Sequence, residues 1–198
     1  MSTAEKRQLT STEYLAIERA AETRSEYFDG EMFAMAGASR KHVRICLNIT
    51  GELHQLFRDR PCEAYASDMR VKVSATGLYT YPDIAVTCLE PMFEDEELDT
   101  LLNPQVVIEI LSESTEGYDR GKKFEHFRRI DSMKEYVLIS QNRCHVERFS
   151  RRDDGPWTLW ESNDLGDTLD LDSIGCELRI ADVYAKVDLS DAPGSPTS

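Results

Sequence analysis

The sequence predicts an α/β (α+β) fold in which helices flank a central mixed β-sheet. Three observations support this class: helical spacing of apolar residues, short apolar strands between the helices, and a length of 198 residues, which suits one domain with a sizeable core. We expect that domain at residues 9–187, between a frayed N-terminus at 1–8 and a flexible tail at 188–198.

The first third of the chain predicts a helix, a hairpin and a second helix. Thr10 and Glu13 match a capping box that opens a short helix. Asp29-Gly30, between apolar residues, is typical of a two-residue hairpin turn. From Ser39 to Arg58, apolar residues recur at three- and four-residue steps, which is the strongest helix signal in the chain.

After Pro61 the pattern becomes short and rich in β-forming residues. Helices are expected at Tyr118–Ile130 and Ile180–Val187, and the acidic loop at 94–97 is expected to be solvated. The predicted strands are Met69–Val73, Pro82–Cys88, Gln105–Leu111, Glu135–Ser140, His145–Phe149 and an edge strand at Trp157–Trp160.

Charge and composition exclude several classes of protein. The 23 Lys and Arg against 37 Asp and Glu give a net charge of −14, which argues against coating nucleic acid by bulk electrostatics but allows a nuclease with a local basic rim. The N-terminus lacks a signal-peptide pattern, and apolar runs are too short for a membrane span. Five scattered cysteines without a C-x-x-C pair argue against a disulfide framework and a zinc knuckle, so a cytoplasmic protein is expected.

Two acids interrupt apolar strands and are candidate metal ligands. Asp83 and Glu109 each lie where a carboxylate is costly unless a cation or hydrogen bonds compensate for its lost hydration. Two carboxylates about 4 Å apart repel by roughly 4 kcal/mol at an effective dielectric constant near 20, and a divalent cation reverses that sign. Oxygen-only ligands favour Mg²⁺ or Mn²⁺. The alternative is that each acid simply stands at a strand end.

Other catalytic classes lack their motifs. The four histidines do not have the spacing of a zinc site. The sequence contains neither a Gly-rich phosphate loop nor a Gly-x-Ser-x-Gly elbow. Zinc hydrolases, nucleotide kinases and serine hydrolases therefore lose support.

A lysine lies inside the apolar stripe of the predicted helix at 118–130. At about 100° per residue, Lys123 falls on the side of Phe127 and Ile130, whereas Lys122 faces water. A lysine on the buried side requires an anionic neighbour, and the acids of the preceding strand are candidates. The alternative is a lysine that snorkels at the edge of the stripe.

An ordered set of motifs from about Leu9 to Tyr184 resembles the Uma-type restriction endonucleases, a family of the PD-(D/E)xK nuclease superfamily. The motifs that carry the resemblance are Glu26-Tyr-Phe-Asp-Gly-Glu31, His42, Ser67-Asp68, Tyr81-Pro-Asp83, Val107-Ile-Glu109-Ile-Leu-Ser112 with Ser114-Thr115, and Tyr118-Asp-Arg-Gly-Lys-Lys123.

The resemblance implies a restriction-endonuclease-like fold and a Mg²⁺- or Mn²⁺-dependent endonuclease that hydrolyses phosphodiester bonds in DNA. It implies that Asp83, Glu109 and the backbone carbonyl of Ile110 bind the metal ion, and that Glu31 is a further acidic residue of the site. The superfamily lysine two residues after the glutamate is replaced by Leu111, and Lys123 on the next helix matches its relocated equivalent.

Two other residues match recurrent positions of the family, but the resemblance assigns them no step of the reaction. Asp68 is a candidate for orienting a metal ligand, and His42 either contacts phosphate or packs at the start of its helix. A basic rim is expected from Arg40, Lys41, Arg44, Arg128 and Arg129, although such charges often only solubilise a helix face.

The expected partners are DNA and a second copy of the chain, without a membrane, because a homodimer suits cleavage of both strands of a duplex. Two other functions remain open. One is a non-catalytic DNA-binding or interaction protein of the same fold, and the other is a nuclease that acts on RNA or a small phosphodiester.

Overall fold

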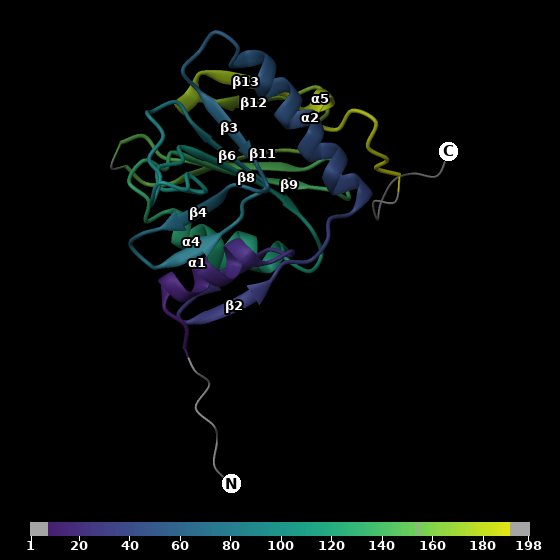
Figure 1. The fold of residues 1–198 in the computed structure, drawn as a ribbon. Coiled ribbons are helices and arrows are strands. Elements are labelled where there is room, and N and C mark those ends of the chain that lie inside the picture. The colour runs from purple at the N-terminus through teal and green to yellow at the C-terminus, as the bar shows by residue number, and fades with distance from the viewer. Residues whose placement is uncertain (1–7, 154, 191–198) are drawn as a thin grey trace.

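The computed structural model describes residues 8–153 and 155–190, so the predicted terminal segments lie largely outside the described residues. In Figure 1 a six-stranded sheet runs through the middle of the molecule. Its strands, in spatial order, are β11 (Thr158–Ser162), β10 (Val146–Ser150), β9 (Glu135–Ser140), β8 (Val106–Leu111), β6 (Ile84–Thr87) and β3 (Glu63–Ala66).

One face of this sheet is covered by the long helix α2 (Arg40–Leu56), the short helix α5 (Ile180–Val183) and the hairpin of β12 (Thr168–Leu171) and β13 (Cys176–Arg179) (Figure 1). A 3₁₀ turn, η2 (Asp172–Ile174), joins the two hairpin strands. Ile45, Ile49 and Leu53 of α2 are fully buried here against apolar residues of the central strands.

The opposite face packs against a second sheet and a composite helix. The second sheet contains β2 (Glu31–Ala34), β1 (Ser25–Phe28), β5 (Leu78–Thr80), β4 (Arg70–Val73) and β7 (Thr100–Leu101), and α1 (Ser11–Ala20) contacts β1. The composite helix consists of α3 (Glu116–Tyr118), the π-helical η1 (Asp119–Lys123) and α4 (Phe124–Phe127).

Strand β8 is buried along its whole length because both of its faces are covered. Ile108 and Ile110 pack on the side of α2, whereas Val107 and Leu111 pack on the side of the composite helix. Since side chains alternate along a strand, Glu109 points to the side of the composite helix. The fold therefore places a carboxylate directly beneath η1.

The structure confirms the predicted fold class and several elements. Thr10 and Glu13 form the capping box of α1. Asp29 and Gly30 both have positive φ, at 49° and 82°, as the predicted hairpin turn requires. Helix α2 spans Arg40–Leu56 within the predicted range.

Two predicted helices have different extents. The expected helix at Tyr118–Ile130 contains a π-helical segment and ends at Phe127, and the expected helix at Ile180–Val187 ends at Val183. The apolar residues that predicted this helix, Phe124, Phe127 and Ile130, all follow the π-helical segment, so their spacing carries no signal of it. Several strands were not predicted: β3, β5, β7 and the hairpin β12–β13.

The acidic loop is not simply solvated, contrary to expectation, because basic side chains bind it. Arg19 lies 2.8 Å from both Asp95 and Asp99. Arg70, only 3% exposed, lies 2.8 Å from Asp99. The loop is therefore fixed to α1 and β4, and part of the acidic excess compensates buried or half-buried cations.

A disulfide joins Cys62 and Cys88, contrary to the expectation from the cysteine pattern. The two cysteines flank the antiparallel pair of β3 and β6, in which Glu63 lies opposite Thr87. The number and spacing of the cysteines do not predict this disulfide, because only the pairing of β3 with β6 brings the two residues together. No helix within residues 8–153 and 155–190 is long and apolar enough to cross a membrane.

We expect reduction of this disulfide to lower the free energy of unfolding by about 3 kcal/mol, because the bond closes a loop of 26 residues in the unfolded chain. The measurement is urea denaturation with and without a reductant. The double variant C62A/C88A is the control, because its stability should not respond to the reductant. Equal responses of both proteins would contradict the disulfide.

Candidate active site

Asp83 immediately precedes β6, at the end of the sheet where β8 extends past its neighbour. Its carboxylate accepts a hydrogen bond from the backbone N–H of Ile110 at 2.7 Å. The other carboxylate oxygen lies 2.9 Å from Nε2 of His42, in the first turn of α2. Two different elements therefore fix the orientation of this carboxylate.

Glu109 lies beside Asp83 and is 3% exposed. The backbone N–H of Asp83 donates to Oε2 of Glu109 at 3.4 Å, so each acid is linked to the strand of the other. In a strand the N–H and C=O of one residue point to the same side. Because the N–H of Ile110 points to Asp83, its carbonyl points to the same edge of the sheet.

Lys123 is on the buried side of the composite helix, whereas Lys122 is exposed, as the helical spacing predicts. Its Nζ lies 2.8 Å from Oε1 of Glu109, 3.6 Å from Oε1 of Glu26 on β1 and 3.7 Å from Oδ1 of Asp119. The π-helical turn carries both Asp119 and Lys123 to this point. One ammonium group thus contacts carboxylates from three elements.

The buried charges shift one another's pKa values. Burial raises the pKa of Glu109 well above its usual value, and Asp119 and Asp83 raise it further, while Lys123 opposes the shift. Burial alone would lower the pKa of Lys123, but the nearby carboxylates of Glu109, Glu26 and Asp119 outweigh it and raise the pKa. The ammonium form of Lys123 is therefore strongly favoured.

The residues present suit a divalent cation. With all groups ionised, the four carboxylates of Asp83, Glu109, Asp119 and Glu26 and the single ammonium of Lys123 sum to −4 + 1 = −3. A cation of charge +2 would offset most of this excess. Carboxylate and backbone carbonyl oxygens are the ligands that Mg²⁺ and Mn²⁺ prefer.

The structure brings together most, but not all, of the residues that the sequence singles out. Asp83, Glu109, Lys123 and His42 meet at one edge. Asp68 lies in the turn between β3 and β4 with its side chain 87% exposed, and its carboxylate is 3.7 Å from Arg24. A role for Asp68 in orienting a metal ligand therefore finds no contact to support it among the residues described.

Glu31 shares a face of the β1–β2 hairpin with Glu26, but Glu26 supplies the contact to Lys123. In the β1–β2 hairpin Glu31 lies opposite Phe28, and residues 26, 28 and 31 share one face. The side chain of Glu26 also accepts a hydrogen bond from Thr80 of β5.

Glu26 and Asp119 both stand within the family-like motifs, although the sequence assigns them no role. The contact of Asp119 with Lys123 could have been predicted, because Asp and Lys four residues apart on a helix commonly pair.

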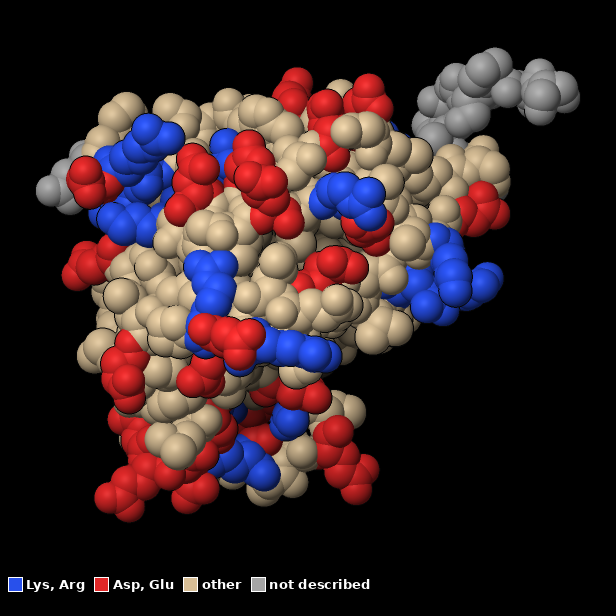
Figure 2. All heavy atoms as spheres, turned by 90° about the horizontal axis from the view of Figure 1, so that it is seen from above, with Lys and Arg blue, Asp and Glu red and all other residues tan. Residues whose placement is uncertain are grey.

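A basic pocket of about 680 Å³ opens at the start of α2. Arg40, Lys41 and Arg44 line it, as the sequence suggests, and Lys186 joins them. Figure 2 shows Lys and Arg side chains gathered at the right-hand edge of the drawn face, where the right-hand end of α2 in Figure 1 lies. Arg128, by contrast, stacks over the ring of Phe124 and does not line the pocket.

The fold is similar to that of a solved structure and of a known family. A solved structure described as "a putative nuclease belonging to DUF820", from Anabaena variabilis, superimposes with a TM-score of 0.71 over 89% of this chain and 98% of that chain, at 20% identity. The family model Uma2, described as "Putative restriction endonuclease", matches residues 11–182, and the chain belongs to this family.

Two relatives come from a Synechocystis species, and both are called uncharacterized proteins. One, sll1609, is 38% identical over 77% of this chain and 86% of its own length. The other, slr1290, is 32% identical over 89% of this chain and 91% of its own length. The predicted family membership is therefore confirmed.

Replacing Lys123 by methionine is expected to lower the free energy of unfolding by about 3 kcal/mol or more, because it leaves buried carboxylates without their cation. Lys122→Met is the matched control on the exposed side of the same segment, and it should change stability by less than about 0.5 kcal/mol. Urea denaturation of both variants measures the difference. Equal losses would show that the buried ion pairs do not stabilise the fold.

Proposed function

We propose that this protein is a Mg²⁺- or Mn²⁺-dependent endonuclease that hydrolyses phosphodiester bonds in DNA. The observation that carries the proposal is the meeting of the Asp83 and Glu109 carboxylates with the buried Lys123 ammonium, close to the start of α2. Membership of the restriction endonuclease family supports the same class of reaction.

In this proposal the side chains of Asp83 and Glu109 and the carbonyl of Ile110 would hold the metal ion. Such an ion supplies Lewis acidity, lowers the pKa of water and neutralises charge on the phosphate. His42 positions Asp83 by its contact with one carboxylate oxygen, while the N–H of Ile110 fixes the other. The two oxygens are thus held before any ligand arrives, which reduces the cost of assembling the site.

Lys123 would act on the attacking water or on the negative charge that develops on the phosphate. Its pKa is raised, so it carries its charge throughout the neutral range. Asp119 and Glu26 limit where the ammonium can lie, because they contact it from two different elements. A fixed cation in a buried site stabilises developing charge more than a solvated one does.

The basic pocket at the start of α2 suits the phosphates that flank the cleaved bond. Arg40 and Arg44 lie on the same first turns of α2 as His42, which contacts Asp83. The backbone N–H groups at a helix N-terminus also favour anions. An acidic protein can therefore present a local cationic surface to DNA.

We expect Asp83→Asn and Glu109→Gln each to reduce plasmid cleavage at least about 100-fold, since metal ligands contribute several kcal/mol of transition-state stabilisation. The assay uses supercoiled plasmid at low salt with Mg²⁺ or Mn²⁺, and EDTA should abolish cutting. Asp68→Asn, which alters an exposed acid outside the contacts of the site, is the matched control. Cleavage by both site variants at the wild-type rate would show that Asp83 and Glu109 do not form the catalytic site.

The same assay separates the alternative functions. Cleavage of RNA but not DNA would show that the protein is a ribonuclease. Binding of DNA without cleavage in the presence of either metal ion would identify a non-catalytic binding protein. Gel filtration with light scattering tests the expected homodimer.

The double variant R40A/R44A is expected to bind DNA more weakly, because two phosphate contacts are removed. The dependence of log affinity on log salt should become shallower by about 0.9 for each lost contact. Arg152→Ala, which removes a 90% exposed arginine elsewhere, should leave both the affinity and the salt dependence unchanged. Equal behaviour of the two variants would show that DNA does not bind at this pocket.

A further inference from the structure

A second group of metal-ligand side chains lies on the same face of the central sheet as Glu109. The strand registers place Glu109 beside Leu138, Leu138 beside Glu147, and Glu147 beside Glu161, in one row across β8, β9, β10 and β11. Two strand spacings separate Glu109 from Glu147, which is about 10 Å. The second group is therefore distinct from the Asp83 and Glu109 site.

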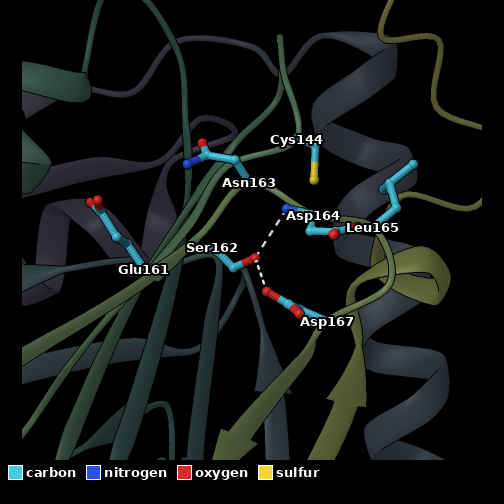
Figure 3. A pocket seen from close by; sticks show the side chains of 7 residues that line it. All are labelled: Cys144, Glu161, Ser162, Asn163, Asp164, Leu165 and Asp167. Carbon is cyan, nitrogen blue, oxygen red and sulfur yellow. Dashed lines mark hydrogen bonds between the residues drawn. The ribbon is translucent and has the colours of Figure 1, made fainter.

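The group consists of His145, Glu147 and Glu161, whose ligand atoms all lie within 4.8 Å of one another. His145 is 9% exposed and Glu147 6% exposed, whereas Glu161 is exposed at the edge strand. Figure 3 shows Glu161 and Asn163 projecting to one side of β11, while Ser162 points the other way toward Asp164 and Asp167. A cation could therefore reach the group from solvent through Glu161.

The hydrogen bond of His145 leaves its other ring nitrogen facing a carboxylate. Nδ1 lies 2.7 Å from the amide oxygen of Asn163, which can only accept a hydrogen bond, so Nδ1 carries the proton. Nε2 lies 3.3 Å from Oε2 of Glu147. The Nε2 lone pair is therefore available to a metal ion that the Glu147 carboxylate also binds. Metal-binding histidines typically donate their other N–H to an oxygen in this way.

The charge balance of the group also favours a divalent cation. Arg120 of η1 contacts Glu147, but it is shared with Glu116, which lies 2.8 Å from it. The three carboxylates of Glu116, Glu147 and Glu161 against the one guanidinium of Arg120 give a net charge of −2. A single divalent ion would balance that charge.

We propose that His145, Glu147 and Glu161 form a second metal site, for a transition ion such as Zn²⁺. One imidazole nitrogen and two carboxylates suit Zn²⁺ better than Mg²⁺, which prefers oxygen ligands alone. Metal ions that share a phosphate oxygen stand about 4 Å apart, so an ion here would be too distant to share a substrate oxygen with the first site. Its role is structural: it joins the edge strands β10 and β11.

The test measures Zn²⁺ binding in a background that lacks the first site. The double variant D83N/E109Q is titrated by calorimetry, and binding of Co²⁺ is followed by its visible absorption. We expect about one ion per chain. Adding Glu161→Gln should weaken Zn²⁺ binding at least tenfold, and adding Asn163→Ala should weaken it about 10- to 100-fold. Glu177→Gln, in an exposed strand position of β13, is the matched control and should change nothing.

Two results would overturn the proposal. One is a folded background variant that binds no Zn²⁺, and the other is equal affinity of the Glu161→Gln and Glu177→Gln proteins. If D83N/E109Q does not fold, wild-type protein saturated with Mg²⁺ is titrated with Zn²⁺ instead, with the same Glu161→Gln and Glu177→Gln comparison. Plasmid cleavage does not enter either readout, so failure of this site is distinguishable from failure of the proposed nuclease.

Discussion

The interaction on which this structure depends is the burial of one ammonium group among carboxylates from separate elements. Taking such charges out of water is costly unless each finds a partner. Lys123 meets Glu109 of the central sheet, Glu26 of the second sheet and Asp119 of its own helical segment. The second sheet and the composite helix are therefore fixed to the central sheet by charge as well as by apolar packing.

The start of α2 combines several tasks in a few residues. Ser39 caps the helix by accepting a hydrogen bond from the N–H of His42, and it also donates to Gln141. His42 reaches Asp83 from the same turn, and Arg40 and Arg44 line the adjacent pocket. A cap that holds the helix start thus also sets the position of the groups that would meet a phosphate. Stability and recognition cannot be altered independently at this point.

Local patterns predicted the parts of the site that lie within single elements. Asp83 and Glu109 interrupt apolar strands, and Lys123 falls on the buried side of a helical stripe, so sequence alone singled out all three. The contact from Glu26 depends on the pairing of β1 with β5, which spans more than 50 residues and leaves no local pattern. The ion pairs of the acidic loop and the disulfide likewise arise only from long-range pairing. The π-helical turn was not predicted, because a constant rotation of 100° per residue describes only an α-helix.

The π-helical turn makes the position of Lys123 depend on the length of this segment. A π turn holds about one more residue than an α turn, so the segment Asp119–Lys123 is one residue longer than the same turn in α geometry. Deleting one residue there would restore α geometry and rotate the flanking halves by about 100° relative to each other. The residues before and after the deletion would then no longer face the central sheet together, even with every side chain retained. One residue more or less in this stretch therefore disturbs the contact of Lys123 with Glu109 without any change in the residues that form it.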